Sequence, residues 1–303
     1  MPGATRLQLI AALLVLVVAA SCTMSSEQRP TVLIGVGSTR EQILLAALTM
    51  VSLEAHGIDP EPVNDHSGTR DLRRGARRGD IDLFWDYTGA AWGLGLRQDL
   101  PPPDPVESFE GVRQEDADTN GFVWLGPTQV NATLALFVRA SEVGQQDRNL
   151  TTLSQRLSAG EPLCADPDFI DRGGGLASLA SSYAINVEQL HSMPAGETDA
   201  IRWVAGGRCF AGLATATSGA ASIAGLVPVE DDLMVFPAFI LAPVVRGATL
   251  EDVPELDDAL LPVISLLGDT TTLRELNAQV EDGVDPAEVA REALGVGKPT
   301  PDR

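Results

Sequence analysis

Apolar positions along the chain alternate between short continuous runs and longer periodic segments. The runs at Thr31–Val36 (TVLIGV), around Pro60–Val63 and at the start of the stretch Gly79–Trp92 are typical of buried strands. Between them, apolar residues recur at helical spacing, which predicts helices at Ser38–Glu54 and Asp71–Arg78. This strand–helix–strand–helix–strand order predicts a largely parallel sheet with helices on both faces.

The first of these helices starts at a recognisable capping signal. Ser38 and Glu41 are three residues apart after the Gly37 turn, which predicts a capping box. Because a helix N-terminus offers free backbone N–H groups, Ser38 is also a candidate ligand contact. The surrounding GVGSTREQ segment lacks the third glycine and the later acid of a dinucleotide loop, so a nucleotide cofactor is not predicted.

The alternation of strands and helices continues through the rest of the chain. The expected helices are Val106–Arg113, Leu150–Leu157, Leu176–Ala184, Asp199–Ala205, Pro254–Leu267, Leu273–Val280 and Pro286–Leu294, and the expected strands are Phe122–Leu125, Ala135–Val138, Pro162–Ala165 and Cys209–Ala214. Two apolar stretches, Thr133–Val138 and Met234–Val245, are interpreted as crossings between two lobes. Two α/β lobes with two crossings predict a clamshell that closes on a small ligand.

The N-terminus is expected to be a targeting segment and not part of the fold. Arg6 precedes the apolar run Leu9–Ala20, and Ala19-Ala20-Ser21-Cys22 resembles a cleavage site that ends in cysteine. This order predicts a lipoprotein with lipid attached at Cys22; the alternative is an ordinary secretory signal. The predicted organisation is a signal peptide at 1–22, a tether at 23–30, a first lobe from 31–136 and 237–296, a second lobe at 137–236 and a tail at 297–303.

Composition limits the classes of partner. The chain is 44% apolar and 5% aromatic, which is typical of a globular protein. Its net charge of −21 argues against nucleic acid and against broad binding to anionic lipid.

Two cysteines remain after Cys22. Cys164 and Cys209 both lie at expected strand starts, and outside the cytoplasm such a pair favours a disulfide over two buried free thiols. The histidines lie apart and form no ligand spacing with the cysteines, so no metal site is predicted.

The stretch GDIDLFWDYTGAAW at 79–92 combines large rings with carboxylates where a strand should end. Ring faces beside an acid favour positive charge, so the stretch indicates a pocket for an organic cation. The alternative is a strand end with amphipathic rings at its rim. Acid–base chemistry by Asp80, Asp82 and Asp86 is a further alternative, but solvated or capping roles are favoured. No Ser-His-Asp or Cys-His set stands out, so an enzyme is not predicted.

Several motifs then occur in the order found in one known family. They are Gly37-Ser38 with Glu41-Gln42, Leu53–Gly57, Gly68-Thr69, Gly79–Leu83 with Asp86–Gly89, Asp168–Arg172, Phe236–Phe239 with Ala242–Arg246, and Leu276-Asn277. In this order the chain resembles the substrate-binding proteins of ABC importers for glycine betaine, choline and carnitine. The resemblance implies a type II periplasmic-binding-protein clamshell that passes a small solute to permease subunits. A ligand-sensing lipoprotein on the same fold remains the alternative.

The resemblance also implies a ligand site in which aromatic rings surround a trimethylammonium group. Tyr87 matches the family's signature tyrosine, Phe239 replaces another, and Arg172 matches the arginine that would meet a ligand carboxylate. Leu134 and Thr215 stand where the family has tyrosines, so four tyrosines cannot surround a ligand here. Thr215 is still expected to contact the ligand, and Trp92 is a candidate to supply one of the missing aromatic rings.

Trp85 is expected on the strand face opposite Tyr87, in core packing, and Tyr183 is expected to pack within a helix. The incomplete set of rings leaves a solute other than a quaternary amine as a second possibility for the ligand.

Overall fold

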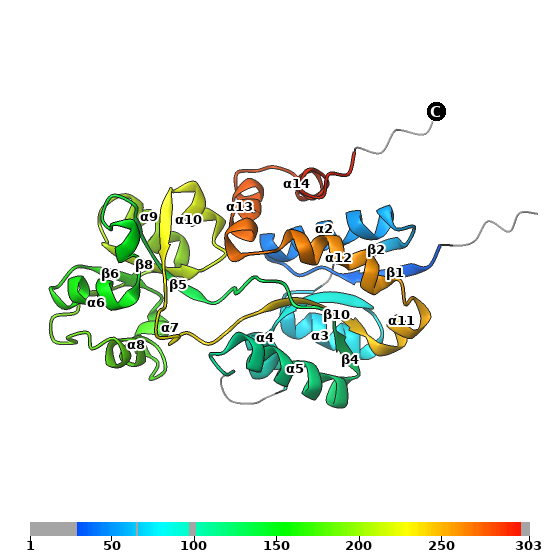
Figure 1. The fold of residues 1–303 in the computed structure, drawn as a ribbon, viewed down its shortest axis with the longest axis horizontal. Coiled ribbons are helices and arrows are strands. Elements are labelled where there is room, and N and C mark those ends of the chain that lie inside the picture. The colour runs from blue at the N-terminus through cyan, green and yellow to red at the C-terminus, as the bar shows by residue number, and fades with distance from the viewer. Residues whose placement is uncertain (1–28, 65, 97–100, 298–303) are drawn as a thin grey trace, which may run out of the picture. The chain divides into compact units, whose positions relative to one another are not determined.

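The structure is a computed structural model that describes residues 29–64, 66–96 and 101–297. The unit Thr31–Arg303 contains two five-stranded sheets (Figure 1). Cys22, the expected signal peptide and most of the expected tether and tail lie outside the described residues.

The first sheet has the strand order β2-β1-β3-β10-β4. Its strands are β1 (Thr31–Gly35), β2 (Asp59–Val63), β3 (Leu83–Tyr87), β4 (Phe122–Trp124) and β10 (Leu241–Arg246). β1 pairs in parallel with β2 and β3, while β10 runs antiparallel to β3 and β4. The predicted parallel arrangement of the first three strands is therefore confirmed, and the returning strand β10 extends it.

Helices cover both faces of this sheet. They are α2 (Arg40–Ala55), α3 (Thr69–Arg78), α4 (Thr88–Ala90), the π-helix η1 (Ala91–Gly95), α5 (Pro105–Asn120), α11 (Gly247–Asp252), α12 (Leu256–Leu266), α13 (Thr270–Glu281) and α14 (Pro286–Ala293). Leu83 packs with α2 and α12 on one face, whereas Phe84 packs with α3 and α5 on the other. α5 is longer than the predicted helix at Val106–Arg113, since Asp104 caps it and Gly121, with φ of 68°, ends it.

The capping box of α2 lies one residue further along than predicted. Thr39 is the N-cap, and its side chain accepts a bond from the Gln42 N–H at 3.1 Å. Ser38 and Glu41 take no part in this box; the Ser38 hydroxyl donates to the Ser67 carbonyl instead. The shift leaves the Glu41 side chain available for other contacts.

The second sheet has the strand order β7-β6-β8-β5-β9. Its strands are β5 (Leu134–Arg139), β6 (Leu163–Ala165), β7 (Ser192–Pro194), β8 (Ala211–Thr215) and β9 (Leu226–Val229), and its helices are η2 (Gln145–Asp147), α6 (Leu150–Ser158), α7 (Pro167–Asp171), α8 (Leu176–Ser182), α9 (Glu197–Ala205) and α10 (Gly219–Ile223). Alternation along β5 sends Leu136 and Val138 toward α6 and α8, and Phe137 toward α9. We call the two sheets with their helices the first and the second lobe.

Two chain segments, at 125–133 and 230–240, cross between the lobes. They bond to each other, because Ala132 N donates to Phe239 O at 2.9 Å and the Thr133 hydroxyl donates to Pro237 O at 2.7 Å. The stretch Thr133–Val138, interpreted above as a crossing, is mostly β5 itself. All of β5 pairs in the second sheet, so the expected lobe boundary after residue 136 falls inside this strand.

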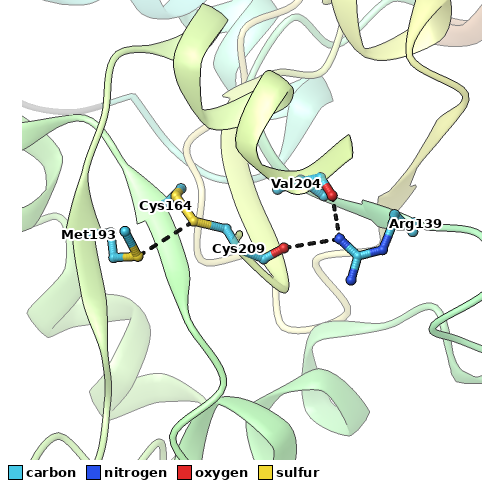
Figure 2. The surroundings of a disulfide bond; sticks show 5 residues. All are labelled: Arg139, Cys164, Met193, Val204 and Cys209. Carbon is cyan, nitrogen blue, oxygen red and sulfur yellow. Dashed lines mark hydrogen bonds between the residues drawn. A yellow bond between two sulfur atoms is a disulfide. The ribbon is translucent and has the colours of Figure 1, made fainter. Parts of the chain in front are cut away.

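A disulfide joins Cys164 of β6 to Cys209, which lies just before β8 (Figure 2). The strands β6 and β8 are parallel neighbours, and the Cα atoms of the two cysteines are 6.0 Å apart. Arg139 donates to the carbonyl oxygens of Val204 and Cys209, so the segment after α9 is also held from β5.

Candidate ligand-binding site

A cavity of about 870 Å³ lies between the lobes. It is lined by Thr39, Arg40, Glu41, Gln42, Thr69, Tyr87, Gly89, Gly93, Pro101, Ala132, Thr133, Leu134, Arg172, Glu197, Thr215, Thr217, Ser218, Pro237, Phe239, Asn277 and Glu281. Most of the first-lobe residues follow the carboxyl ends of β1, β2 and β3, where ligands of open α/β sheets bind.

Two aromatic rings face this cavity from the first lobe and the second crossing. Tyr87 is the last residue of β3, and Phe239 lies in the crossing that leads to β10. The Phe239 ring lies against the backbone of Gly89: a Cβ at position 89 would be 2.3 Å from the ring. Only glycine therefore lets the Phe239 ring occupy this position beside Tyr87.

Glu41 places a carboxylate beside the Tyr87 ring. The Tyr87 hydroxyl donates to Glu41 Oε1, and Asn277 Nδ2 donates to Glu41 Oε2 at 2.7 Å. Burial, together with the negative charge of Glu41, raises the pKa of Tyr87 well above its usual value, so the phenol stays protonated and donates. Within the described part of the chain, no Lys or Arg forms an ion pair with Glu41.

The wall from the second lobe has a different composition. Leu134 of β5 and Thr215 of β8 are paired neighbours in the sheet. The Thr215 backbone N–H and hydroxyl both donate to the Glu197 carboxylate, at 3.0 to 3.2 Å. Arg172 lies nearby on the cavity wall, with its guanidinium 5.5 Å from the centre of the Phe169 ring. This wall therefore offers hydroxyl and charged groups to a ligand.

Helix α13 connects the two walls at one end of the cavity. Asn277 Nδ2 donates to Thr217 O at 2.9 Å, and Arg274 Nη1 donates to Ala216 O at 2.9 Å. A Cβ on Gly219 of α10 would lie 2.6 Å from the Asn277 backbone, so the two helices are in close contact. Asn277 thus contacts Glu41 of the first lobe and the backbone of the second.

The acids of the GDIDLFWDYTG stretch lie outside the cavity lining and have structural partners. Asp86 is fully buried, 2.6 Å from the guanidinium of Arg73, which also pairs with Asp116. Burial raises the pKa of Asp86 to about 6, although the charge of Arg73 opposes this rise. Asp82 accepts bonds from the Leu33 N–H and from Arg246, so it holds β1 and β10 to the loop before β3. The interpretation of Asp86 as an acid of the cation pocket is wrong.

The structure places four of the predicted ligand residues on the cavity wall: Tyr87, Phe239, Arg172 and Thr215. The predicted residues Ser38 and Trp92 are not among the described lining residues. Trp92 packs beside α5 and its Nε1–H donates to Ser108 O, because the chain enters α4 at Thr88 and continues into η1, which carries the indole away from the cavity.

Trp85 is buried in the core, and its indole N–H donates to the Thr49 hydroxyl of α2 at 2.7 Å. The expectation that it points away from Tyr87 is wrong, since residues two apart on a strand share a face. Both rings lie against α2. Tyr183 is buried as expected, and its hydroxyl donates to Asp231.

Glu41, Asn277 and Glu197 are among the polar cavity residues that the sequence did not predict as ligand contacts. Glu41 and Asn277 lie in the family-like motifs, but the first was assigned to helix capping. Glu197 follows Gly196 at the start of α9 and carries no sequence signal of its own. Only the pairing of β8 with β5, and the packing of α9 on both, brings it to the cavity.

Neither a candidate membrane-spanning helix nor a candidate metal site occurs among the described residues. No helix there combines the length and the apolar character needed to span a bilayer. No group of three or more His, Cys, Asp or Glu side chains is arranged to hold a metal ion there.

Comparison with known proteins bears on both the fold and the site. Residues 30–295 match the family model described as the substrate-binding domain of the ABC-type glycine betaine transport system. The glycine betaine-binding protein YehZ of Escherichia coli (strain K12) is 30% identical over 292 residues, covering 92% of this chain and 94% of that protein. The glycine-betaine-binding protein of Pseudomonas aeruginosa PAO1 is 29% identical and covers 88% of each chain.

Solved structures agree with the architecture. Apo YehZ superposes with a TM-score of 0.78 at 28% identity, covering 88% of this chain and 98% of that one. A crystal structure described as a glycine betaine/carnitine/choline ABC transporter gives a TM-score of 0.79 at 20% identity, covering 87% and 97%. The predicted periplasmic-binding-protein clamshell is thereby confirmed.

Proposed function

The chain belongs to the family of substrate-binding domains of ABC-type glycine betaine transport systems, and we propose that its own ligand is a small organic cation of the glycine betaine and choline type. Members of this family are extracytoplasmic receptors that bind a solute and deliver it to an ABC permease. The choice of ligand for this chain depends on the residues of the cavity.

One observation carries the proposal: Tyr87, Phe239 and the Glu41 carboxylate face the same cavity. A trimethylammonium group donates no hydrogen bonds, so it is attracted by ring faces and by negative charge. Glu41 is held by the neutral donors Tyr87 and Asn277, so its negative charge can interact with a cationic ligand in the cavity.

The rest of the ligand would face the second lobe. We infer that Arg172 meets the carboxylate of a zwitterion such as glycine betaine, because a guanidinium forms strong, charge-assisted hydrogen bonds with a carboxylate. Thr215 and Ser218, which also line the cavity, offer hydroxyl groups to the hydroxyl of choline.

Isothermal titration calorimetry on the purified mature chain tests this function. Choline and glycine betaine should bind, with proline and ectoine as comparison solutes. The neutral choline isostere 3,3-dimethylbutan-1-ol, with carbon in place of the charged nitrogen, should bind at least about tenfold more weakly if cation–π attraction holds the ligand. Failure of every quaternary amine to bind, or equal binding of choline and its isostere, would overturn the proposal.

We also propose that Cys22 carries a lipid that anchors the protein to the outer face of the cell membrane. The apolar run followed by Ala19-Ala20-Ser21-Cys22 supports this placement. In a bacterial host, the wild-type protein should fractionate with membranes and a Cys22→Ala variant should not be lipidated. Mass spectrometry of the mature N-terminus distinguishes the lipoprotein from a simple secreted protein.

A further inference from the structure

Glu197 is a carboxylate on the cavity wall that the function proposed above does not use. It is the first residue of α9, and its carboxylate accepts hydrogen bonds from the backbone and the hydroxyl of Thr215 at the end of β8. Both residues line the cavity. Among the described residues, no Lys or Arg forms an ion pair with Glu197.

A negative residue in the first turn of a helix is favourable for the helix itself, and this alone could explain Glu197. Asp199 shows what that simpler role looks like in the same turn. It is paired with Arg202 at 2.6 Å and does not appear among the described cavity-lining residues. Glu197 instead reaches across to β8, where neutral donors fix its position and leave its charge uncompensated.

The cavity therefore receives an unpaired carboxylate from each lobe, Glu41 from the first and Glu197 from the second. Glu281 of α13 is a third acid on the wall. Burial raises the pKa of Glu281, and the charge of Glu197 adds to this rise while Arg40 opposes it. The negative charge of Glu197 in the second lobe thus acts on Glu281 in the first lobe. A cation between the two lobes would be stabilised by both carboxylates.

We propose that Glu197 is a second cation-binding carboxylate, supplied by the second lobe, and that it favours ligands of net positive charge over zwitterions. The inference rests on the proposed function, since it assumes a cationic head group in this cavity. Choline and glycine betaine carry the same trimethylammonium group but differ in net charge, which is +1 for choline and zero for the betaine. On the second wall, the Glu197 carboxylate attracts the head group of either ligand and repels the carboxylate of the betaine, whereas Arg172 attracts that carboxylate. Glu197 therefore favours choline, which has no carboxylate to repel.

The test is titration calorimetry with choline and glycine betaine on matched variants. Glu197→Gln removes the charge and keeps an oxygen that accepts from Thr215, whereas Asp199→Asn makes the same charge change two residues away. We expect Glu197→Gln to weaken choline binding about tenfold and glycine betaine binding less than about threefold, with a smaller difference at high salt. Asp199→Asn should leave both affinities within about twofold, since its charge is exposed and screened.

Three outcomes would overturn the inference: equal loss for both ligands, no loss of choline affinity, or the same loss in Asp199→Asn. A Glu197→Asp variant, which keeps the charge, should retain the preference for choline, and melting curves check that each variant is folded. If the wild-type chain binds neither ligand, the proposed function and this inference fail together. If it binds both and Glu197→Gln is indifferent to ligand charge, only the inference fails.

Discussion

The two walls of the ligand cavity, one from each lobe, differ in the side chains that they offer to a cationic ligand. The first lobe and its crossing supply the rings of Tyr87 and Phe239, while the second lobe supplies Leu134, Thr215 and the Glu197 carboxylate. Ring faces attract any ammonium group of suitable shape, whereas a carboxylate also responds to the charge on the rest of the ligand. The proposed function and the inference about Glu197 together assign affinity to the first wall and selection to the second.

The largest expected effect comes from removing the ring of the first wall. Tyr87→Ala should weaken binding of choline and glycine betaine alike by about 30-fold, because a desolvated cation–π contact contributes about 2 kcal/mol. Tyr87→Phe keeps the ring and loses the bond to Glu41, so its loss should be smaller. Titration calorimetry measures both variants. Equal losses in the two variants would show that the hydroxyl of Tyr87, and not its ring, is responsible for its contribution to ligand affinity.

A smaller effect should follow from displacing the second ring without deleting it. In Gly89→Ala the new methyl group would lie 2.3 Å from the Phe239 ring, which must move. We expect about a tenfold loss of affinity for both ligands, as for one weakened cation–π contact. Gly93→Ala is the matched control, since Gly93 also lines the cavity but a Cβ there meets nothing within 4 Å. A similar loss in both variants would contradict the role given to Phe239.

The smallest expected effect is a gain from adding a ring to the second wall. Leu134→Tyr should tighten binding of choline and glycine betaine about threefold, because a partly solvated cation–π contact contributes about 0.5–1 kcal/mol. Leu134→Met changes the shape but adds no ring, so its affinities should match the wild type. A ring that weakens binding in calorimetry would show that Leu134 packs against the ligand and does not merely leave space.

Most of the fold was predictable because the chain's apolar runs and helix periods are well separated. The strands at Thr31 and Leu83 and the helix end at Gly57 follow from local pattern and from the positive φ that glycine adopts there. The start of α2 was harder to predict, because two capping boxes are possible. Ser38 is followed three residues later by Glu41, and Thr39 by Gln42. Choosing between them requires the backbone geometry at Thr39.

Residues of the site could be predicted only where they belong to a recognisable local sequence motif. Tyr87 ends a strand and follows a distinctive signature, so it was found. Asp86 has the same local setting, but the partner that buries it, Arg73, lies on a helix across the sheet face. Glu197 reaches the cavity only through long-range strand pairing, which no local pattern reveals.

The buried disulfide of the second lobe bears on when the bond forms relative to folding. Both cysteine side chains are 0% exposed, so the folded lobe shields the sulfurs from oxidants. The bond therefore forms most readily while β6 and β8 are still assembling. The disulfide therefore links correct folding of the second lobe to an oxidising compartment.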